Sequence, residues 1–358
     1  MEKLRFAILG AGCGGQSMAA ILENQGCAVT LMDKNEALVQ ELKQEEKLTL
    51  TGKIELTAPM PACVTTDAAE AIDGADVILV VTTADGHEDV ARAIAKTIRP
   101  EQIVVLNPGM FCGALAFRTA LSRFGCPHEI LVAEMADLMF ACRKVKAGTV
   151  FHSGLKKKAV LAAVPASKTD AVVELLKPYF PIVTPAQDIL HTAMSSIGCV
   201  LHCVPMIMNV NKIDAGQSFD YYMEGITPSI ARMAEKVDAE RIALAKKLGI
   251  VASTAQSVIN GYGSHGENLY EVIQTTQAYV GIQSPSSLAH RFCHEDTFGS
   301  LVGFATLAKE LDVPTPGMDA IITCISMATG IDYFTVGRTA QKVGLTGKSV
   351  EEIYEMIR

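Results

Sequence analysis

The sequence of 358 residues has no uncharged apolar run of about 18 residues, the length that a membrane-spanning helix needs. Its first apolar stretch, Phe6 to Leu9, is also far shorter than the roughly 7–15 apolar residues of an export signal. Clusters of arginine and lysine are lacking, and 31 basic against 39 acidic residues give a net charge of −8. These absences argue against a membrane protein and against a nucleic-acid-binding surface.

The sequence also lacks a CxxC pair and any Cys/His spacing typical of zinc sites, although it contains ten cysteines. We therefore expect no metal site and no disulfide framework. The cysteines stand in apolar or strand-like surroundings such as "FACRK" and "LHCVP", as expected of buried, reduced thiols. Thiols of this kind are typical of a reducing compartment, so we expect a cytoplasmic protein.

Hydrophobic residues (49%) and a length of 358 residues predict a folded protein of two domains. In the first half, apolar runs of the kind found in doubly covered parallel sheets alternate with helical segments. After about residue 186 strand-like runs cease, and helical segments such as 227–249 follow one another. We therefore predict an α/β domain over residues 1–186 and an all-α domain over residues 187–358. The five predicted strands are 5–9, 28–32, 77–81, 103–107 and 130–134.

A glycine motif follows the first predicted strand directly and opens a helix. In "ILGAGCGGQ", Gly10 permits a tight turn, Gly12 lets the backbone approach a pyrophosphate, and Gly15 allows the helix to contact the strand closely. The free N–H groups at the start of the helix favour the negative charge of that pyrophosphate. The first domain is therefore predicted to be a Rossmann domain whose cofactor loop comprises Gly10, Ala11, Gly12, Cys13, Gly14 and Gly15.

Asp33 ends the second predicted strand, 18 residues after Gly15. A carboxylate at this place accepts hydrogen bonds from a ribose 2′-hydroxyl and repels a 2′-phosphate, which favours NAD. The neighbouring Lys34 partly offsets that repulsion and leaves NADP open.

Hydride transfer to a carbonyl or imine needs a proton donor, and histidine is the side chain best suited to that role near neutral pH. Among the histidines of the second half (191, 202, 265, 290 and 294), His202 lies on an apolar helix with Asn209 two turns further on the same face. Pro205, between them, should bend this helix. The pattern suggests a catalytic His202 and a substrate-binding Asn209, although a core histidine with a satisfied hydrogen bond is also compatible with it.

A second candidate cluster is "AHRFCHEDTFGSLVG", which contains Arg291 and Asp296. An arginine can bind the carboxylate of a keto acid in bidentate fashion, and a carboxylate can orient a histidine and stabilise its charged form. The same spacing is compatible with an exposed, salt-bridged loop.

The chain resembles the opine dehydrogenase family, of the octopine and nopaline type, nearly from end to end. The resemblance rests on the segments "ILGAGCGGQSMAA", "LNPGMFCGALAFR", "AEMADLMFACR", "VLHCVPMIMN", "YYMEGITPSIARMAEKVDAERIALAKKLG", "HRFCHEDTFGSLV", "VPTPGMDAII" and "GRTAQKVGLTGKS".

This resemblance implies a Rossmann domain followed by a helical domain. It implies an enzyme that reductively condenses an α-keto acid with the amino group of an amino acid, using NADH or NADPH. The family's catalytic histidine falls on His202, its partner aspartate on Asp296 and its carboxylate-binding arginine on Arg291. Whether the chain forms a homodimer is left open.

The chain departs from the family pattern around the predicted histidine and aspartate, where it has Ser196, Gly198, Cys203, Thr297 and Phe298. These changes concern the amino-donor pocket and leave two other functions open. The first is a dehydrogenase of hydroxyl compounds, of the ketopantoate or glycerol-phosphate type, which would use a catalytic lysine such as Lys212 or Lys236. The second is a non-catalytic dinucleotide-binding sensor.

Overall fold

The computed structural model describes residues 3–358, which form two compact units. The first unit comprises residues 3–192 together with 356–358, and the second comprises residues 193–355. The division thus falls six residues after the predicted boundary at 186, and the last three residues of the chain return to the first unit.

An eight-stranded sheet forms the centre of the first unit, in the order β12-β11-β8-β7-β6-β1-β2-β5. All neighbouring strands are parallel except β8 and β11. The five predicted strands are present as β1, β2, β6, β7 and β8, with ends that agree to within one residue. The strands of the sheet are β1 Arg5–Leu9, β2 Ala28–Met32, β5 Cys63–Thr65, β6 Val77–Val80, β7 Ile103–Leu106, β8 Leu131–Met135, β11 Ala159–Val164 and β12 Val183–Pro185.

The helices of the first unit connect the parallel strands, as a sheet of this type requires. Asp67 caps α3 by accepting hydrogen bonds from the N–H groups of Ala69 and Glu70. The helices are α1 Cys13–Asn24, α2 Glu36–Gln44, α3 Ala68–Ile72, α4 His87–Ile94, α5 Gly113–Arg123 and α6 Thr169–Leu176, and α7 Ile189–Ser195 crosses the division between the units.

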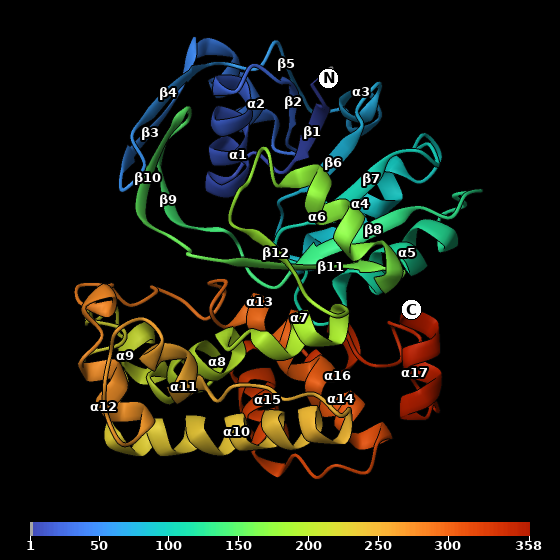
Figure 1. Ribbon diagram of the computed structural model, residues 1–358. Coiled ribbons are helices and arrows are strands. Elements are labelled where there is room, and N and C mark those ends of the chain that lie inside the picture. Colours follow the sequence, from blue (N-terminus) through green and yellow to red (C-terminus); the bar gives the residue numbers. More distant parts are fainter. Residues whose placement is uncertain (1–2) are drawn as a thin grey trace. The chain divides into compact units, whose positions relative to one another are not determined.

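A second sheet of four strands, which the sequence did not predict as such, has the order β4-β3-β10-β9. Helix α1 contacts both sheets and lies between them (Figure 1). This helix is therefore almost wholly buried, which explains why its sequence is small and apolar rather than amphipathic. The strands are β3 Lys47–Gly52, β4 Leu56–Pro59, β9 Phe140–Lys146 and β10 Thr149–Leu155.

The second unit is helical, and among its residues the only strand-like pairing is a single bridge between Asp220 and Gln283. The longest helix, α10, begins after the cap Thr227, whose hydroxyl accepts from the N–H of Ile230. A capping box is present at the last helix between Ser349 and Glu352. The helices are α8 Gly198–Met208, α9 Val210–Asp214, α10 Pro228–Lys247, α11 Ala255–Asn260, α12 Leu269–Gln274, α13 His294–Asp296, α14 Val302–Glu310, α15 Pro316–Thr329, α16 Tyr333–Val336 and α17 Val350–Ile357.

Helix α8 runs through Pro205 to Met208, with Asn209 as its C-cap, so Pro205 does not end the helix. A proline has no N–H, so Pro205 cannot donate to the carbonyl of Leu201 four residues earlier. The hydroxyl of Tyr221 contacts this carbonyl at 3.3 Å and the carbonyl of His202 at 3.0 Å. A side chain from outside the helix therefore satisfies the backbone that Pro205 leaves free.

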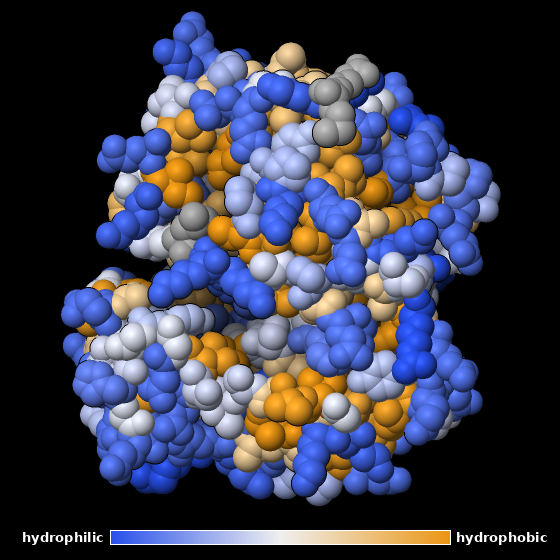
Figure 2. Space-filling model, in the orientation of Figure 1, coloured by the Kyte–Doolittle hydropathy of each residue, from blue (hydrophilic) through white to orange (hydrophobic). Residues whose placement is uncertain are grey.

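Among the described residues no single helix has the length and apolar character to cross a membrane. Helices α7 and α8, with a bend of 42° between them, meet that test of length and composition only as a pair. On the face drawn in Figure 2, hydrophilic side chains are spread over both units, and apolar patches are interspersed among these side chains.

His152 on β10 is a buried histidine whose environment makes the stability of the first unit depend on pH. Its Nε2 lies 2.9 Å from the hydroxyl of Ser17, and its Nδ1 is buried without a partner among the described residues. Burial lowers the pKa of His152 below its ordinary value. As the pH falls, His152 therefore takes up a proton at a higher pH in the unfolded chain than in the folded chain.

The contribution of His152 is present in full above a pH of about 6.5, the pKa of an unfolded histidine, and is lost as the pH falls from there to the lower folded pKa. We expect the free energy of unfolding to fall in this window by up to about 1.4 kcal/mol per pH unit. In urea titrations between pH 7 and pH 5, His152→Leu should remove this dependence, because leucine has no group that titrates. The hydroxyl of Ser17 keeps a partner in this variant, since it still donates to the carbonyl of Cys13. The exposed His128→Gln is the matched control, and an unchanged slope in His152→Leu would contradict the assignment.

Candidate active site

The glycine loop of the first unit has the geometry of a phosphate-binding turn. Gly10 has φ +111°, and a Cβ there would lie 2.5 Å from the carbonyl oxygen of Val81. A Cβ at Gly15 would collide with the carbonyl oxygen of Gly10, so the close contact between helix and strand requires glycine. At Gly12, in contrast, a Cβ would meet no atom within 4 Å. The loop is therefore open at Gly12, beside the N-terminus of α1, where a pyrophosphate fits.

Asp33 is held against this loop. One oxygen of its carboxylate accepts a 2.7 Å hydrogen bond from the N–H of Ala11, and the other accepts a 2.9 Å bond from the N–H of Asn35. A carboxylate has about four acceptor positions, so Asp33 retains capacity for ribose hydroxyls. Lys34 contacts Asp89 at 3.4 Å on the surface. The residues present thus fit a dinucleotide.

Thr82 is a candidate cofactor contact that the sequence analysis missed. It follows β6 at the same edge of the sheet as the glycine loop, and its Cγ2 would lie 3.0 Å from a Cβ at Gly10. Its hydroxyl is buried and has no hydrogen-bond partner among residues 3–358. Buried hydroxyls are normally paired, so this group is suited to a bound ligand. The two threonines that end "VILVVTT" were the available signal in the sequence.

In the second unit, His202 and Asp296 lie together although 94 residues separate them. Nδ1 of His202 is 3.0 Å from Oδ2 of Asp296, and the two side chains are 18% and 8% exposed. A carboxylate can only accept at this contact, so Nδ1 carries a proton and the neutral imidazole presents Nε2 as its basic atom. The ring of Phe292 stacks on the imidazole with centroids 3.9 Å apart and an angle of 8°. The pair therefore has a fixed tautomer and a fixed ring plane.

The backbone around Asp296 brings its carboxylate to α8. Asp296 ends α13 and precedes a π-helical turn, Thr297–Leu301, a kind of irregularity that is frequent at functional sites. On the facing helix, a Cβ at Gly198 would lie only 2.6 Å from Oδ1 of Asp296 and 3.7 Å from Nδ1 of His202. Gly198, one of the departures from the family pattern, therefore provides the space that the carboxylate occupies.

We expect Gly198→Ala to displace the Asp296 carboxylate and to lower kcat by about 10-fold or more, because the new methyl group occupies its place and the imidazole loses its orienting partner. Binding of the cofactor should change by less than about twofold, since the glycine loop lies in the other unit. Steady-state kinetics and NADH fluorescence titration measure the two quantities. Gly216→Ala is a control for the loss of a glycine, because a Cβ at Gly216 would meet no atom within 4 Å. Its φ of +67° adds backbone strain that Gly198→Ala does not have. Full turnover in Gly198→Ala would show that the Asp296 contact is not needed.

Two further residues that depart from the family pattern, Cys203 and Thr297, contact one another. The thiol of Cys203 lies 3.4 Å from the hydroxyl of Thr297, and both residues are buried. Burial raises the pKa of the Cys203 thiol well above its ordinary value, so it remains protonated. This pair fills the space beside the His202–Asp296 pair with two small, neutral, mutually bonded groups.

The two predicted substrate-binding residues differ in their surroundings. Arg291 is half exposed, and its Nε lies 3.2 Å from the buried carboxylate of Glu295. Asn209 is buried, and its amide donates to the carbonyls of Pro205 and Gly225. Both amide hydrogens of Asn209 are therefore used inside the protein, and the predicted substrate contact gains no support from these bonds. Its role stays a prediction.

The lysines of the hydroxyl-dehydrogenase alternative have other contacts. Nζ of Lys212 lies 4.9 Å from the centre of the Phe219 ring, and Nζ of Lys236 lies 3.6 Å from the carboxylate of Glu240. The side chain of Lys236 is 63% exposed, as expected of a residue on a solvated helix face.

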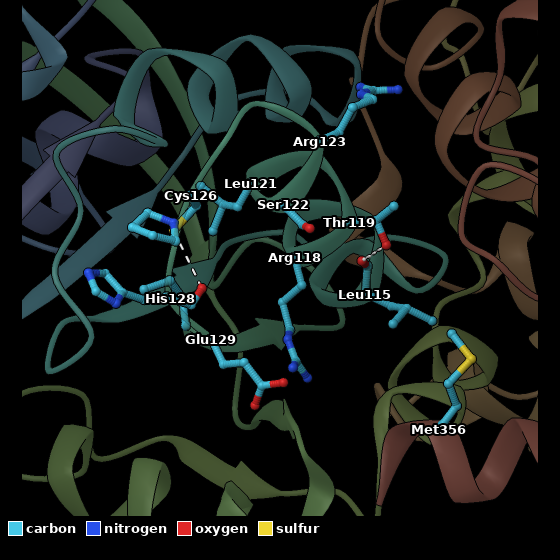
Figure 3. A pocket seen from close by; sticks show the side chains of 12 residues that line it. Leu115, Arg118, Thr119, Leu121, Ser122, Arg123, Cys126, His128, Glu129 and Met356 are labelled. Atoms are coloured by element: carbon cyan, nitrogen blue, oxygen red, sulfur yellow. Dashed lines mark hydrogen bonds between the residues drawn. The ribbon is translucent and has the colours of Figure 1, made fainter.

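A pocket of about 700 Å³ in the first unit is separate from the glycine loop. It lies between the second half of α5 and residues 126–130, which precede β8 (Figure 3). Arg118 and Glu129 extend into it from these two segments. Because β7 and β8 are parallel, the start of β8 is at the sheet edge opposite to the glycine loop. This pocket is therefore not the dinucleotide site.

Comparisons with known proteins agree with this division of the chain. Residues 185–329 match the family model of the α-helical domain of NAD/NADP octopine/nopaline dehydrogenases, and residues 5–115 match the N-terminal domain of NAD-dependent glycerol-3-phosphate dehydrogenases. The opine dehydrogenase of Arthrobacter sp. (strain 1C) is 35% identical over 97% of both chains. The protein ocs of Agrobacterium vitis is 26% identical over 80% of both chains. The structure of octopine dehydrogenase with NADH and L-arginine has a TM-score of 0.81 at 18% identity, covering 98% of each chain.

The chain belongs to the opine dehydrogenase family. It is an NAD(P)-dependent oxidoreductase of the class that acts on CH–NH groups and condenses a keto acid reductively with an amino acid. The predicted fold class, a Rossmann domain followed by a helical domain, is confirmed. The hydroxyl-dehydrogenase alternative shares the architecture, since a ketopantoate reductase has a TM-score of 0.65 at 16% identity, but that similarity shows the fold alone.

Proposed function

We propose that the enzyme carries out its reductive condensation with His202 as the proton-transfer group, Asp296 as the residue that orients it, and Arg291 as the group that binds the keto-acid carboxylate. The observation that supports this assignment best is the 3.0 Å contact between Nδ1 of His202 and Asp296. It leaves Nε2 as the single basic atom of a histidine whose ring plane is fixed by Phe292.

The loop from Gly10 to Gly15 would hold NAD(P)H, which when bound would supply the hydride for the imine formed from the two substrates. In the reverse direction Nε2 of His202 takes up the proton that the secondary amine loses, and the nitrogen forms the C=N bond as the adjacent carbon loses its hydride. Asp296 stabilises the imidazolium that results, as a carboxylate does on the far nitrogen of a catalytic histidine. Arg291 places the keto-acid carboxylate by paired N–H donors.

The substrates we propose are a small α-keto acid and the amino group of an α-amino acid. Solved structures of octopine dehydrogenase with L-arginine and with pyruvate support this pairing. Asp33, with oxygens still able to accept from ribose hydroxyls, supports NAD as the preferred cofactor, and the exposed contact of Lys34 with Asp89 leaves little free positive charge for a 2′-phosphate.

A matrix assay tests this function. Keto acids are varied against amino acids while the absorbance of NADH or NADPH is followed. The proposal requires that consumption of NADH by a keto acid depend on an amine co-substrate. Oxidation of NADH by a keto acid alone would instead support a dehydrogenase of hydroxyl compounds. Cofactor binding without turnover across the whole panel would support a sensor.

We also propose that the enzyme acts in the cytoplasm, and we leave open whether it forms a homodimer. All ten cysteines, which lie among the described residues, are free thiols, which supports a reducing compartment. Light scattering of the purified protein tests the dimer, and fractionation of the producing cells tests the location.

A further inference from the structure

The second ring nitrogen of His202 already has a partner in this structure. Nε2 lies 3.1 Å from the hydroxyl of Tyr222, twenty residues further along the chain. The neutral imidazole has one lone pair in its ring plane at Nε2, so Tyr222 donates to it. A substrate amine cannot occupy this in-plane position while the hydroxyl of Tyr222 is there.

The ring of Tyr222 is held firmly in place. It stacks on Tyr279 with centroids 4.1 Å apart and an angle of 11°, and it contacts Tyr221 edge to face at 4.9 Å. Its backbone N–H lies 3.2 Å from the carboxylate of Asp220, and the residue is only 5% exposed. Displacing this ring would break both aromatic contacts, each worth about 0.5–1.5 kcal/mol beyond burial. The hydroxyl therefore stays on Nε2 when substrate binds.

We infer that Tyr222 is a catalytic residue whose hydroxyl relays the proton between Nε2 of His202 and the substrate nitrogen. In the reductive direction His202 starts as the imidazolium, protonated on both ring nitrogens; the hydroxyl of Tyr222 gives its own proton to the substrate nitrogen and takes the proton of Nε2. One O–H bond and one N–H bond break while one N–H bond and one O–H bond form, and His202 ends neutral. The relay rests on the proposed function, since it extends the role given to His202.

The environment of the hydroxyl suits a concerted relay. Burial raises the pKa of Tyr222 well above its ordinary value, Tyr279 and Asp296 raise it further and Arg291 lowers it, so a free phenolate is disfavoured and the two proton transfers are coupled. His202 is the only hydrogen-bond partner of this hydroxyl among the described residues. The oxygen of the Tyr222 hydroxyl therefore has an acceptor position that is available to a substrate N–H.

The test compares Tyr222→Phe with Tyr262→Phe, a matched control at a tyrosine of the same unit that is 57% exposed. Phenylalanine keeps the stack on Tyr279 and removes only the hydroxyl. We expect kcat to fall about 100-fold or more in Tyr222→Phe, the usual size of a lost acid–base group, with KM for both substrates and Kd for NADH within about threefold. Tyr262→Phe should retain full turnover. Turnover within threefold of wild type in Tyr222→Phe would overturn the relay.

A double variant separates the relay from a structural role and from the proposed function. If the two groups act as one unit, His202→Gln/Tyr222→Phe should be no slower than His202→Gln alone, whereas independent losses would multiply and contradict the relay. If His202→Gln itself keeps full turnover, the proposed function fails. If it is inactive while Tyr222→Phe is active, only the relay fails.

A proton inventory of the wild-type enzyme needs no substitution. Single-turnover rates of NADH oxidation are measured at increasing fractions of D₂O. A relay moves two protons in one step and predicts a curved dependence, whereas transfer from His202 alone predicts a straight line. A straight line together with a normal primary isotope effect from deuterated NADH would overturn the relay, even if Tyr222→Phe failed to fold.

Discussion

Replacing His202 by glutamine is expected to lower kcat by about 10²–10⁴-fold while the Kd for NADH stays within about twofold. Glutamine is of similar size and can donate to Asp296 through its amide, but it cannot take up or release a proton near neutral pH. The loss should therefore appear in both reaction directions and in kcat rather than in cofactor binding. Steady-state kinetics and fluorescence titration with NADH measure these effects.

The matched control for this variant is His265→Gln. His265 is an exposed histidine of the same unit, and its backbone N–H and carbonyl both bond to the hydroxyl of Thr275. Its replacement should leave kcat unchanged. Turnover near the wild-type value in His202→Gln would show that the proton comes from another group.

The largest expected loss of stability comes from Arg241→Met in α10. Arg241 is fully buried, and its guanidinium makes two contacts with Oδ1 of Asp238, at 2.9 and 2.7 Å. It also donates to the carbonyls of Met194 and Ser253. Methionine would leave the buried carboxylate without its counter-ion and two carbonyls without a donor. We expect a loss of about 3–5 kcal/mol in the free energy of unfolding of the second unit.

Urea unfolding followed by tyrosine fluorescence and far-UV circular dichroism measures this loss. Arg232→Met, at an exposed position of the same helix, is the matched control and should change the free energy by less than about 0.5 kcal/mol. Since Oδ2 of Asp238 accepts from the N–H of Ala255, the start of α11 should be the first part to lose protection in hydrogen exchange. A loss below 1 kcal/mol in Arg241→Met would contradict the role of the buried pair.

Much of the first unit followed from local patterns. The five parallel strands are continuous apolar runs because both faces of their sheet are covered, and a short window of sequence is enough to recognise them. The four-stranded sheet was missed for the opposite reason. Its strand β3 alternates buried leucines with part-exposed threonines, so its apolar content is low, and its partner β10 lies about a hundred residues away.

In the second unit, residue types and the family resemblance predicted the pairing of His202 with Asp296, but the contacts with Phe292 and Tyr222 came only from the structure. Tyr222 reaches Nε2 because α8 and the segment after it fold back on one another, which no local spacing predicts. Glycine is required at position 198 because of the position of Oδ1 of Asp296, which is 98 residues further along the chain. Arg241 and Asp238 are three residues apart on a helix, a spacing that usually marks an exposed ion pair.

The contact between Cys203 and Thr297 has a consequence for redesign of the enzyme. The two positions share one small volume and one hydrogen bond, so an exchange at either position alone leaves a group with the wrong size or polarity for its neighbour. Libraries that vary the surroundings of His202 and Asp296 should therefore change these two codons jointly, because single-site scanning would miss combinations that fit one another.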